Sequence, residues 1–220
     1  MRILLTGFEP NDDGLNASEL VVRSIQENPP SELLPYRDLI ECRVLPGNTE
    51  LLGEHIYQML DYLSPDICLL TGQARGYNKL VVERFAINLR FFVTLDRVGN
   101  APKGLPVERQ GAAAYLSSLP DLEQIISRLE TENIPAAISN HGGTHLCNQS
   151  FYHALHFAHR KRPQMQVGFV HIPALPEQVI HYWPESPFMP KEMTRSALSL
   201  IILLLLVEDS SLNVPLQKVE

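Results

Sequence analysis

The sequence predicts an α/β sandwich, with a mostly parallel central sheet and helices on both of its faces. Short apolar segments, each long enough for one strand, alternate with segments whose apolar residues recur at helical spacing. This alternation is typical of parallel sheets, because each helix returns the chain to the start of the next strand. No internal repeat, low-complexity segment or change of composition divides the chain. We therefore expect residues 1–220 to form a single domain.

The first half of the chain predicts three strands and two helices. The strands are expected at residues 2–6, 39–45 and 66–70. The third is apolar throughout, as strands in the centre of a parallel sheet are. Asn16, followed three residues later by Glu19, resembles a capping box, so a helix should begin there. Thr49 is the expected cap of a second helix.

The second half of the chain continues the alternation. We expect strand-like segments at 80–82 and 85–93, a loop at 99–107, a helix at 121–130, a short buried strand at 134–138, a helix from about 146 to 159, a strand at 166–171 and a final helix at about 191–207. Five prolines punctuate the segment before that final helix. Its apolar run is shorter than the ~20 residues that a membrane span needs, so we expect no membrane association.

Composition and charge narrow the classes of function. The chain has 220 residues, 45% of them hydrophobic and 20% charged, which is ordinary for a globular domain. A net charge of -7 and a pI near 5.6, without a basic stripe, argue against a nucleic-acid partner. Three cysteines without paired spacing suit a reducing compartment. The N-terminal segment is too short for a signal peptide, so we expect a cytoplasmic protein.

The most informative stretch is residues 139–150, which contains Cys147. An apolar strand runs into it, Gly142 and Gly143 allow a sharp turn, and a helical pattern follows. Cys147 should therefore lie in the first turn of a helix, where free N–H groups and the helix dipole favour a thiolate. A nucleophilic role competes here with the ordinary alternative of a small buried residue.

A cysteine nucleophile needs a base and a group that orients the base. His171 ends an apolar strand and is the best candidate for the base. Glu83 stands among strand-forming residues, where a buried charge needs a partner; that partner is either an imidazolium or a basic residue such as Arg84. Four strand ends with unusual chemistry, at residues 7–9, 72–73, 141–147 and 171, could converge on one edge of the sheet.

Other histidines offer alternatives. A metal site could use His141, His145 and Cys147, although their spacing matches no common zinc signature. We expect no metal and no cofactor. His153, His156 and His159 repeat at intervals of three along the predicted helix, which is typical of a partly exposed helix face.

Six motifs occur in an order that resembles the pyroglutamyl peptidase I family, whose members are also called pyrrolidone-carboxylate peptidases. The motifs are Thr6-Gly7-Phe8-Glu9-Pro10, Gly72-Gln73-Ala74, Glu83-Arg84-Phe85-Ala86-Ile87-Asn88, Ile134-Pro135-Ala136, Gly143-Thr144-His145-Leu146-Cys147-Asn148 and Phe169-Val170-His171-Ile172-Pro173. The resemblance covers the chain from its start to about residue 178. It implies a cytosolic cysteine peptidase with an α/β/α fold and no cofactor, often a homo-oligomer (dimer or tetramer), that acts on small peptides with a blocked N-terminus.

The resemblance also implies roles for individual residues. Cys147 is similar to the family's nucleophile, His171 to its general base and acid, and Glu83 to its orienting carboxylate. The residues that correspond to the substrate pocket are Phe8, Asn11, Gln73, His145 and Leu146.

The chain departs from the family pattern around this pocket. Asn11 and His145 stand where aromatic residues are usual, Asp12 and Asp13 replace two glycines, and Val93 falls where an arginine is common. We therefore expect the reaction class to be kept, namely removal of an N-terminal pyroglutamyl or related acyl or aminoacyl residue. The changed residues favour an acyl group more polar than pyroglutamate, so we expect weak activity on pyroglutamyl substrates. The alternatives are a binding or regulatory protein of the same fold with little turnover, and a metal-dependent hydrolase.

Overall fold

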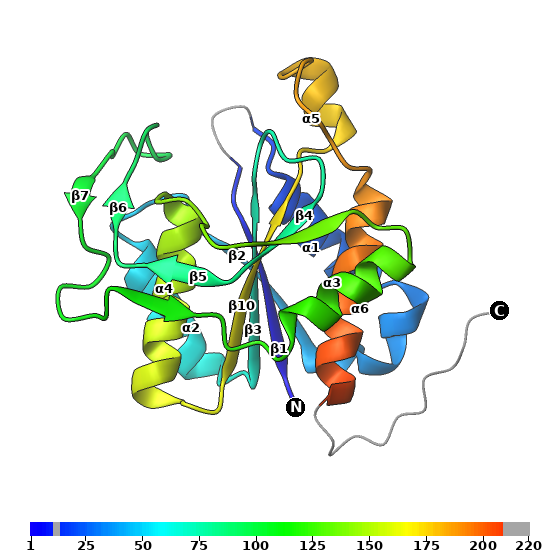
Figure 1. The fold of residues 1–220 in the computed structure, drawn as a ribbon, viewed down its shortest axis with the longest axis horizontal. Helices are drawn as coiled ribbons and strands as arrows, with labels where there is room; N and C mark the ends of the chain where they lie inside the picture. Colours follow the sequence, from blue (N-terminus) through cyan, green and yellow to red (C-terminus); the bar gives the residue numbers. More distant parts are fainter. Residues whose placement is uncertain (11–13, 209–220) are drawn as a thin grey trace.

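The computed structural model describes residues 1–10 and 14–208, which form a six-stranded sheet between two layers of helices (Figure 1). In their order across the sheet the strands are β2 (Ile40–Leu45), β1 (Ile3–Phe8), β3 (Ile67–Gln73), β10 (Gln166–Ile172), β4 (Leu80–Glu83) and β9 (Ala136–Ser139). All neighbours are parallel except β10 and β4. The predicted α/β class with a mostly parallel sheet is confirmed, and β3 lies inside the sheet as expected.

Successive residues of each strand pack into different cores on the two faces of the sheet. Ile67 and Leu69 of β3 belong to one core, whereas Cys68 and Leu70 belong to the other. The first core is covered by α1 (Ala17–Glu27), α3 (Leu122–Thr131) and α6 (Lys191–Glu208), and the second by α2 (Leu52–Leu63) and α4 (Leu146–Lys161). Burial on both faces explains why the central strands are continuous apolar runs.

Helix α1 begins where the sequence predicts, although its cap differs from the expected one. Asn16 is the N-cap, and its Oδ1 accepts a hydrogen bond from the N–H two residues later at 3.0 Å. Glu19 does not complete a capping box; it forms an ion pair of 2.8 Å with Arg23, one turn further along the helix.

The prediction that Thr49 caps the next helix is wrong. Leu51 is the N-cap of α2 and makes no side-chain cap bond. The N–H of Thr49 donates to Asp96 at 2.9 Å, and its hydroxyl donates to Gln149 at 2.6 Å. Thr49 therefore forms hydrogen bonds with residues that are far away in sequence, and a local sequence pattern does not reveal such partners.

Residues 85–116 depart most from the predicted elements. The expected strand at 85–93 is broken into β5 (Phe85–Ile87), which pairs with β8 (Ala114–Leu116), and β6 (Arg90–Phe91), which pairs with β7 (Lys103–Leu105). β7 lies within the segment that we expected to be a loop. Asn88 explains the break, because its side chain exchanges two 2.8 Å hydrogen bonds with the backbone of Glu108.

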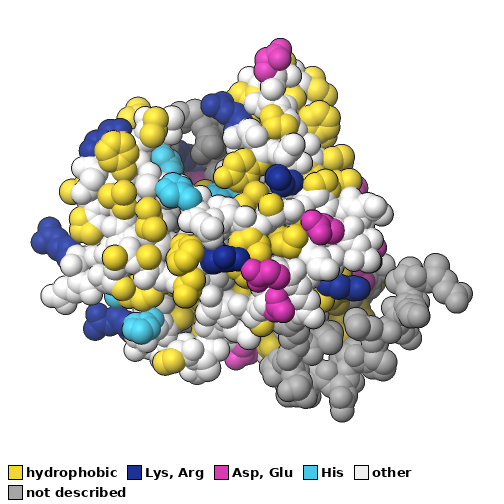
Figure 2. All heavy atoms as spheres, in the orientation of Figure 1, with side chains coloured by type: hydrophobic (Ala, Val, Ile, Leu, Met, Phe, Trp, Pro, Cys, Tyr) yellow, Lys and Arg dark blue, Asp and Glu magenta, His cyan; other side chains and the backbone are white. Residues whose placement is uncertain are grey.

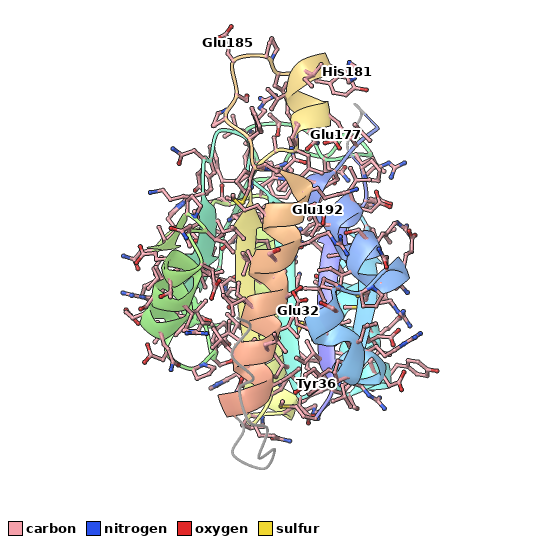
Figure 3. The ribbon with its side chains drawn as sticks, turned by 90° about the vertical axis from the view of Figure 1, so that its right-hand side faces the viewer. Glu32, Tyr36, Glu177, His181, Glu185 and Glu192 are labelled. Carbon is pink, nitrogen blue, oxygen red and sulfur yellow. The ribbon has the colours of Figure 1, made fainter. Side chains whose placement is uncertain are left out.

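Three further elements complete the fold. β9 was expected to be buried, but it is an edge strand and is half-buried. The short helices η1 (Ser31–Leu39) and α5 (Pro176–His181) were not predicted. Figure 3 shows α5, with Glu177 and His181, standing above the end of α6 that carries Glu192. Within residues 1–10 and 14–208, no helix is both long and apolar enough to cross a membrane.

Candidate active site

Cys147 lies in the first turn of α4, immediately after a loop that connects β9 to this helix. The loop turns at Gly143, whose φ of +77° is a conformation that favours glycine. His145 is the N-cap, so Cys147 lies among N–H groups that have no partner within the helix. The positive end of the helix dipole favours a thiolate at this position. The strand, turn and helix expected around Cys147 are all present.

The beginning of α4 is held in place by the two residues that follow Cys147. The side chain of Asn148 accepts from the N–H of Ile87 at 2.9 Å and donates to the carbonyls of Ile87 and Leu89 at 2.9 and 3.2 Å. Gln149 donates to the carbonyl of Thr49 at 2.7 Å and accepts from its hydroxyl. Each such bond contributes ~1 kcal/mol, so the helix has little freedom to shift relative to the sheet.

The sulfur of Cys147 lies directly against the backbone of β3. A Cβ added at Gly72 would be 2.7 Å from Sγ of Cys147 and 2.9 Å from the ring of Phe169. Only a residue without a side chain leaves room for the sulfur at this distance. Gly72 therefore sets the position of the thiol.

His171 is the second-last residue of β10, on the face of the sheet that α4 covers. Its ring lies between two aromatic rings, with centroids 4.8 Å from Phe169 and 6.0 Å from Tyr77. The residue is 6% exposed. This burial removes most of the water that would otherwise solvate an imidazolium, so a charged His171 needs charged partners.

Glu83 supplies one of these partners. Oε1 of Glu83 is 2.8 Å from Nδ1 of His171. The contact follows from the antiparallel register of β4 and β10, in which Glu83 stands opposite Phe169. His171, two residues beyond Phe169, is then a diagonal neighbour of Glu83 on the same face. Of the four strand ends that we expected to converge, those at residues 7–9, 72–73 and 171 end parallel strands at one edge of the sheet. β9 is parallel to β4 and so runs the other way, and the loop after it returns the chain so that Cys147 meets Gly72 and His171.

The electrostatic environment of His171 favours its protonated form. Burial by itself would lower the pKa of His171. The negative charge of Cys147 and the hydrogen bonds to Cys147 and Glu83 outweigh burial and raise this pKa to about 9. A protonated His171 would stabilise negative charge on the sulfur beside it, which is the form that a cysteine nucleophile needs.

The alternative in which Glu83 pairs with a basic residue is wrong for Arg84. Arg84 instead forms an ion pair of 2.7 Å with Glu123 on the surface. Glu83 is 0% exposed, and its second oxygen, Oε2, accepts no hydrogen bond from the described part of the chain. Because a buried carboxylate is costly, its attachment to His171 indicates a functional purpose.

The alternative of a metal site finds no geometric support. Apart from residues 11–13 and 209–220, the structure contains no group of three or more His, Cys, Asp or Glu side chains that could hold a metal ion. His141 is exposed and its Nδ1 accepts from the N–H of Gly143 at 3.1 Å. His145 turns to another partner, Phe92.

Comparisons with known proteins agree with this geometry. The family model described as pyroglutamyl peptidase matches residues 1–207. The chain belongs to the pyroglutamyl peptidase family. It is therefore an enzyme, a cysteine-type omega peptidase, as the resemblance implied.

Two relatives and two solved structures illustrate the similarity. The chain is 33% identical over 190 residues to pyrrolidone-carboxylate peptidase 1 of Caldanaerobacter subterraneus subsp. tengcongensis, covering 86% of this chain and 90% of that protein. It is 36% identical over 200 residues to a pyrrolidone-carboxylate peptidase of Brevibacillus brevis, covering 91% and 90%. Pyroglutamyl peptidase I of Bacillus amyloliquefaciens superposes with a TM-score of 0.81 at 30% identity, covering 90% and 93%. A mutant pyrrolidone carboxyl peptidase from P. furiosus gives 0.85 at 30%, covering 95% and 100%.

The residues that correspond to the family's substrate pocket lie in different settings. Phe8 is 4% exposed at the end of β1, and Leu146 is buried in the same core. Gln73 ends β3, and its Oε1 accepts from the N–H of Ala17 at 2.8 Å and from Gln178 at 2.9 Å. Gln73 thus fixes the start of α1 and the position of α5. Asn11 lies outside the described residues.

His145 behaves as an aromatic ring rather than as a charged group. It stacks on Phe92 with ring centroids 3.8 Å apart, and its Nε2 is 3.3 Å from the carbonyl oxygen of Thr94. Burial lowers its pKa, against the opposing effects of the Thr94 carbonyl and Asp96. Nearby, the N–H of Phe91 donates a hydrogen bond to the carbonyl of Thr144, and the hydroxyl of Thr144 donates one to the carbonyl of Phe91. The segment that contains β6 therefore forms one rim of the site. Figure 2 shows a hollow at this edge of the molecule.

Tyr77 is the site residue that the sequence analysis missed. It lies in the β3–β4 loop, and its ring meets that of His171 at 81°. Burial, and next the charges of Glu83 and Cys147, raise the pKa of its hydroxyl. Nothing in the residues next to Tyr77 in this loop indicates that its ring would contact His171.

The expectation that the α4 histidines form a partly exposed face is wrong for two of them. His153 and His156 are buried, and only His159 is exposed. Nδ1 of His153 is 3.2 Å from both Tyr57 and Glu108, and Nδ1 of His156 is 2.9 Å from the hydroxyl of Tyr115. The hydrogen bond from His153 lowers the pKa of Glu108 to about 2. These histidines tie Glu108 and β8 to α4.

The contact at Gly72 gives a direct test of the thiol's position. Gly72→Ala should lower kcat by ~10²-fold, because an alanine Cβ 2.7 Å from the sulfur must displace it. Steady-state rates, with circular dichroism to verify folding, measure the effect. Gly142→Ala is the matched control, since its Cβ would meet Glu83 at an ordinary 3.5 Å. Equal losses in both variants, or none in Gly72→Ala, would show that activity does not depend on the position of the Cys147 thiol.

Proposed function

We propose that the enzyme hydrolyses the amide bond that follows an N-terminal pyroglutamyl residue of small peptides, with Cys147, His171 and Glu83 as its catalytic triad. The observation that carries the proposal is the chain of contacts from Glu83 to His171 to Cys147 at the start of α4. Relatives named pyrrolidone-carboxylate peptidase support the choice of acyl group.

The proposed reaction has two half-reactions. The thiolate of Cys147 attacks the pyroglutamyl carbonyl carbon, and the resulting tetrahedral intermediate collapses as His171 gives its proton to the departing amine. A water molecule then attacks the thioester while His171 accepts one of its protons. Pyroglutamate leaves, and the proton that His171 took from water restores the imidazolium beside the released thiolate of Cys147. Glu83 keeps the imidazole in one orientation and stabilises its charge throughout.

Negative charge on the substrate oxygen would be stabilised by backbone N–H groups in the first turn of α4. These groups point along the helix axis and have no intrahelical partners. They are fixed in place because Asn148 and Gln149 anchor this turn. A preorganised donor of this kind typically contributes ~10²–10³-fold to kcat.

The side chains around the pocket support a flat, neutral acyl group and not the more polar one that the sequence led us to expect. Phe8 and Leu146 contribute apolar surface beneath it, and His145 presents a ring whose neutral form is favoured by burial, which lowers its pKa. A pyroglutamyl ring has apolar faces and only two polar atoms, so such walls fit it. Gln73 would act mainly through α5 and α1, because its oxygen already accepts two bonds.

We also propose a cytoplasmic location and a homo-oligomer, either a dimer or a tetramer. Cys42 and Cys68 are buried free thiols, which suits a reducing compartment. Val93 and Leu95 are 84% and 66% exposed on the segment beside the site. Exposed apolar side chains that cluster in this way often pack against another protein surface.

A binding or regulatory protein that has lost turnover is the second candidate, but the geometry favours it less. The costly burial of Glu83 and the raised pKa of His171 are unnecessary for binding alone. A metal-dependent hydrolase is favoured less again, because no metal-binding group was found among residues 1–10 and 14–208.

A panel of fluorogenic reporters tests the proposed reaction. Wild-type enzyme should cleave the pyroglutamyl reporter and leave the alanyl, prolyl and glutamyl reporters essentially intact. Cys147→Ala should abolish turnover because it removes the nucleophile.

Cys42→Ala provides the matched control for that variant. Burial raises the pKa of the Cys42 thiol to about 12, so this thiol should play no part in the reaction. Cys42→Ala should therefore keep wild-type kcat. Binding of the pyroglutamyl reporter without cleavage by wild-type enzyme would support the binding-protein alternative instead.

The raised pKa of His171 predicts the pH dependence of activity. The imidazolium persists below about pH 9 and is lost above it, so kcat/KM should fall along a limb near pH 9. Glu83→Gln removes a charge that raises this pKa, so the limb should move to lower pH and the maximal rate should fall.

Glu123→Gln is the control for this change, since Glu123 forms an ion pair with Arg84 at the surface. Its pH profile should match that of wild type. If the limb stays in place in Glu83→Gln while the fold is intact, Glu83 does not set the protonation of His171.

A further inference from the structure

The β3–β4 loop carries an arginine that the proposed mechanism does not use. Arg75 is exposed, and its guanidinium lies 5.0 Å from the centroid of the Trp183 ring. Other arginines, such as Arg84, Arg97 and Arg195, have carboxylate partners. Arg75 forms no ion pair with any carboxylate in the described ranges 1–10 and 14–208. Within these ranges its charge is therefore unpaired, and the ring of Trp183 holds the guanidinium in place.

The backbone fixes Arg75 close to the catalytic residues. The N–H of Ala74 donates to the carbonyl of Ile172, the neighbour of His171, at 2.9 Å. The N–H of Tyr77 closes a turn onto Ala74 at 3.2 Å, and Gly76 has φ +98°, as the third residue of a type II turn requires. Arg75 is the second residue of this turn, so it projects from the rim.

Residues close to Arg75 in sequence contact Cys147 and His171, so this rim belongs to the candidate active site. Gly72, three residues earlier, touches the sulfur of Cys147, and Tyr77, two residues later, contacts His171. Figure 1 shows the β3–β4 connection arching between α5 and the segment that contains β6. Trp183, which holds the guanidinium, follows α5. Arg75 thus lies at the mouth of the site.

The chemistry of the substrate indicates what this cation would meet. A pyroglutamyl residue is a lactam and carries no charge at the N-terminus. A short pyroglutamyl peptide with an unmodified C-terminus always carries one charge, the carboxylate at the other end, in the leaving group. The whole protein carries a net charge of -7, which disfavours anionic ligands unless a cation is placed near the site. Figure 3 shows Glu177 and Glu185 on and beyond α5, and neither pairs with Arg75.

We propose that Arg75, stacked on Trp183, binds the C-terminal carboxylate of a short leaving group, so that the preferred substrates are pyroglutamyl amino acids and very short pyroglutamyl peptides with a free carboxylate. This inference rests on the proposed function. Planar guanidinium groups bind carboxylates through paired hydrogen bonds, and a partner ring keeps the plane in one orientation. The contact acts on binding and not on the reacting atoms, so Arg75 is a specificity residue.

The test compares pyroglutamyl-alanine with pyroglutamyl-alaninamide, which differ only in the charge of the leaving group. Wild-type kcat/KM should be about three- to fivefold higher for the free acid, the size expected of one exposed ion pair, mainly through KM. The preference should weaken in high salt. Arg75→Gln should reduce the acid-to-amide ratio to about one, and Arg75→Lys should keep part of it.

Arg160→Gln is the matched control, because it removes the same charge from the surface. Arg160 is exposed near the end of α4, ~20 Å along the helix from Cys147. This variant should keep the wild-type ratio. A wild-type ratio of one, or a ratio that survives Arg75→Gln, would overturn the role of Arg75 and leave the proposed function standing. Failure of wild-type enzyme to cleave either substrate would overturn both.

Discussion

The hydrogen bond between Glu83 and His171 is the constraint on which the rest of the site depends. It places a carboxylate with 0% exposure inside the sheet, where its charge is tolerated only because the imidazole beside it can carry a proton. That proton in turn favours a thiolate at Cys147. Charge on each of the three residues is thus stabilised by its neighbour, and removing any one leaves an uncompensated group. This coupling explains how a buried histidine has a raised pKa.

The fold makes this coupling possible through one reversal in the sheet. β4 runs antiparallel to β10, which brings Glu83 diagonally across from His171. Cys147 arrives from the helix that covers the same face, and Gly72 leaves the space for its sulfur. The side chains of Asn148 and Gln149 then attach α4 to β5 and to the residues just before α2 through hydrogen bonds. The positions of Glu83, His171 and Cys147 are therefore determined by the backbone and by buried amide side chains rather than by the three residues themselves.

The sequence predicted the local features of this site and not the contacts between its parts. A strand, two glycines and a helical pattern were enough to place Cys147 at a helix start, and a terminal histidine on an apolar strand indicated His171. The pairing of Glu83 with His171 depends on a register between strands that are far apart in sequence. The residues alone left two partners open for Glu83, an imidazolium or a basic residue, and the resemblance to a family implied the first. Thr49, Asn88 and Tyr77 act on distant partners, and for this reason a reading of nearby residues misjudged or missed them.

The central claim is that His171 is an imidazolium in the resting enzyme, and ¹⁵N NMR of histidine-labelled protein tests it most directly. The signals of His171 can be identified by their loss in His171→Gln. Both ring nitrogens should be protonated at pH 7 and should titrate near pH 9, well above the ordinary value for histidine. A neutral His171 ring at pH 7, with a pKa at or below that ordinary value, would contradict the account.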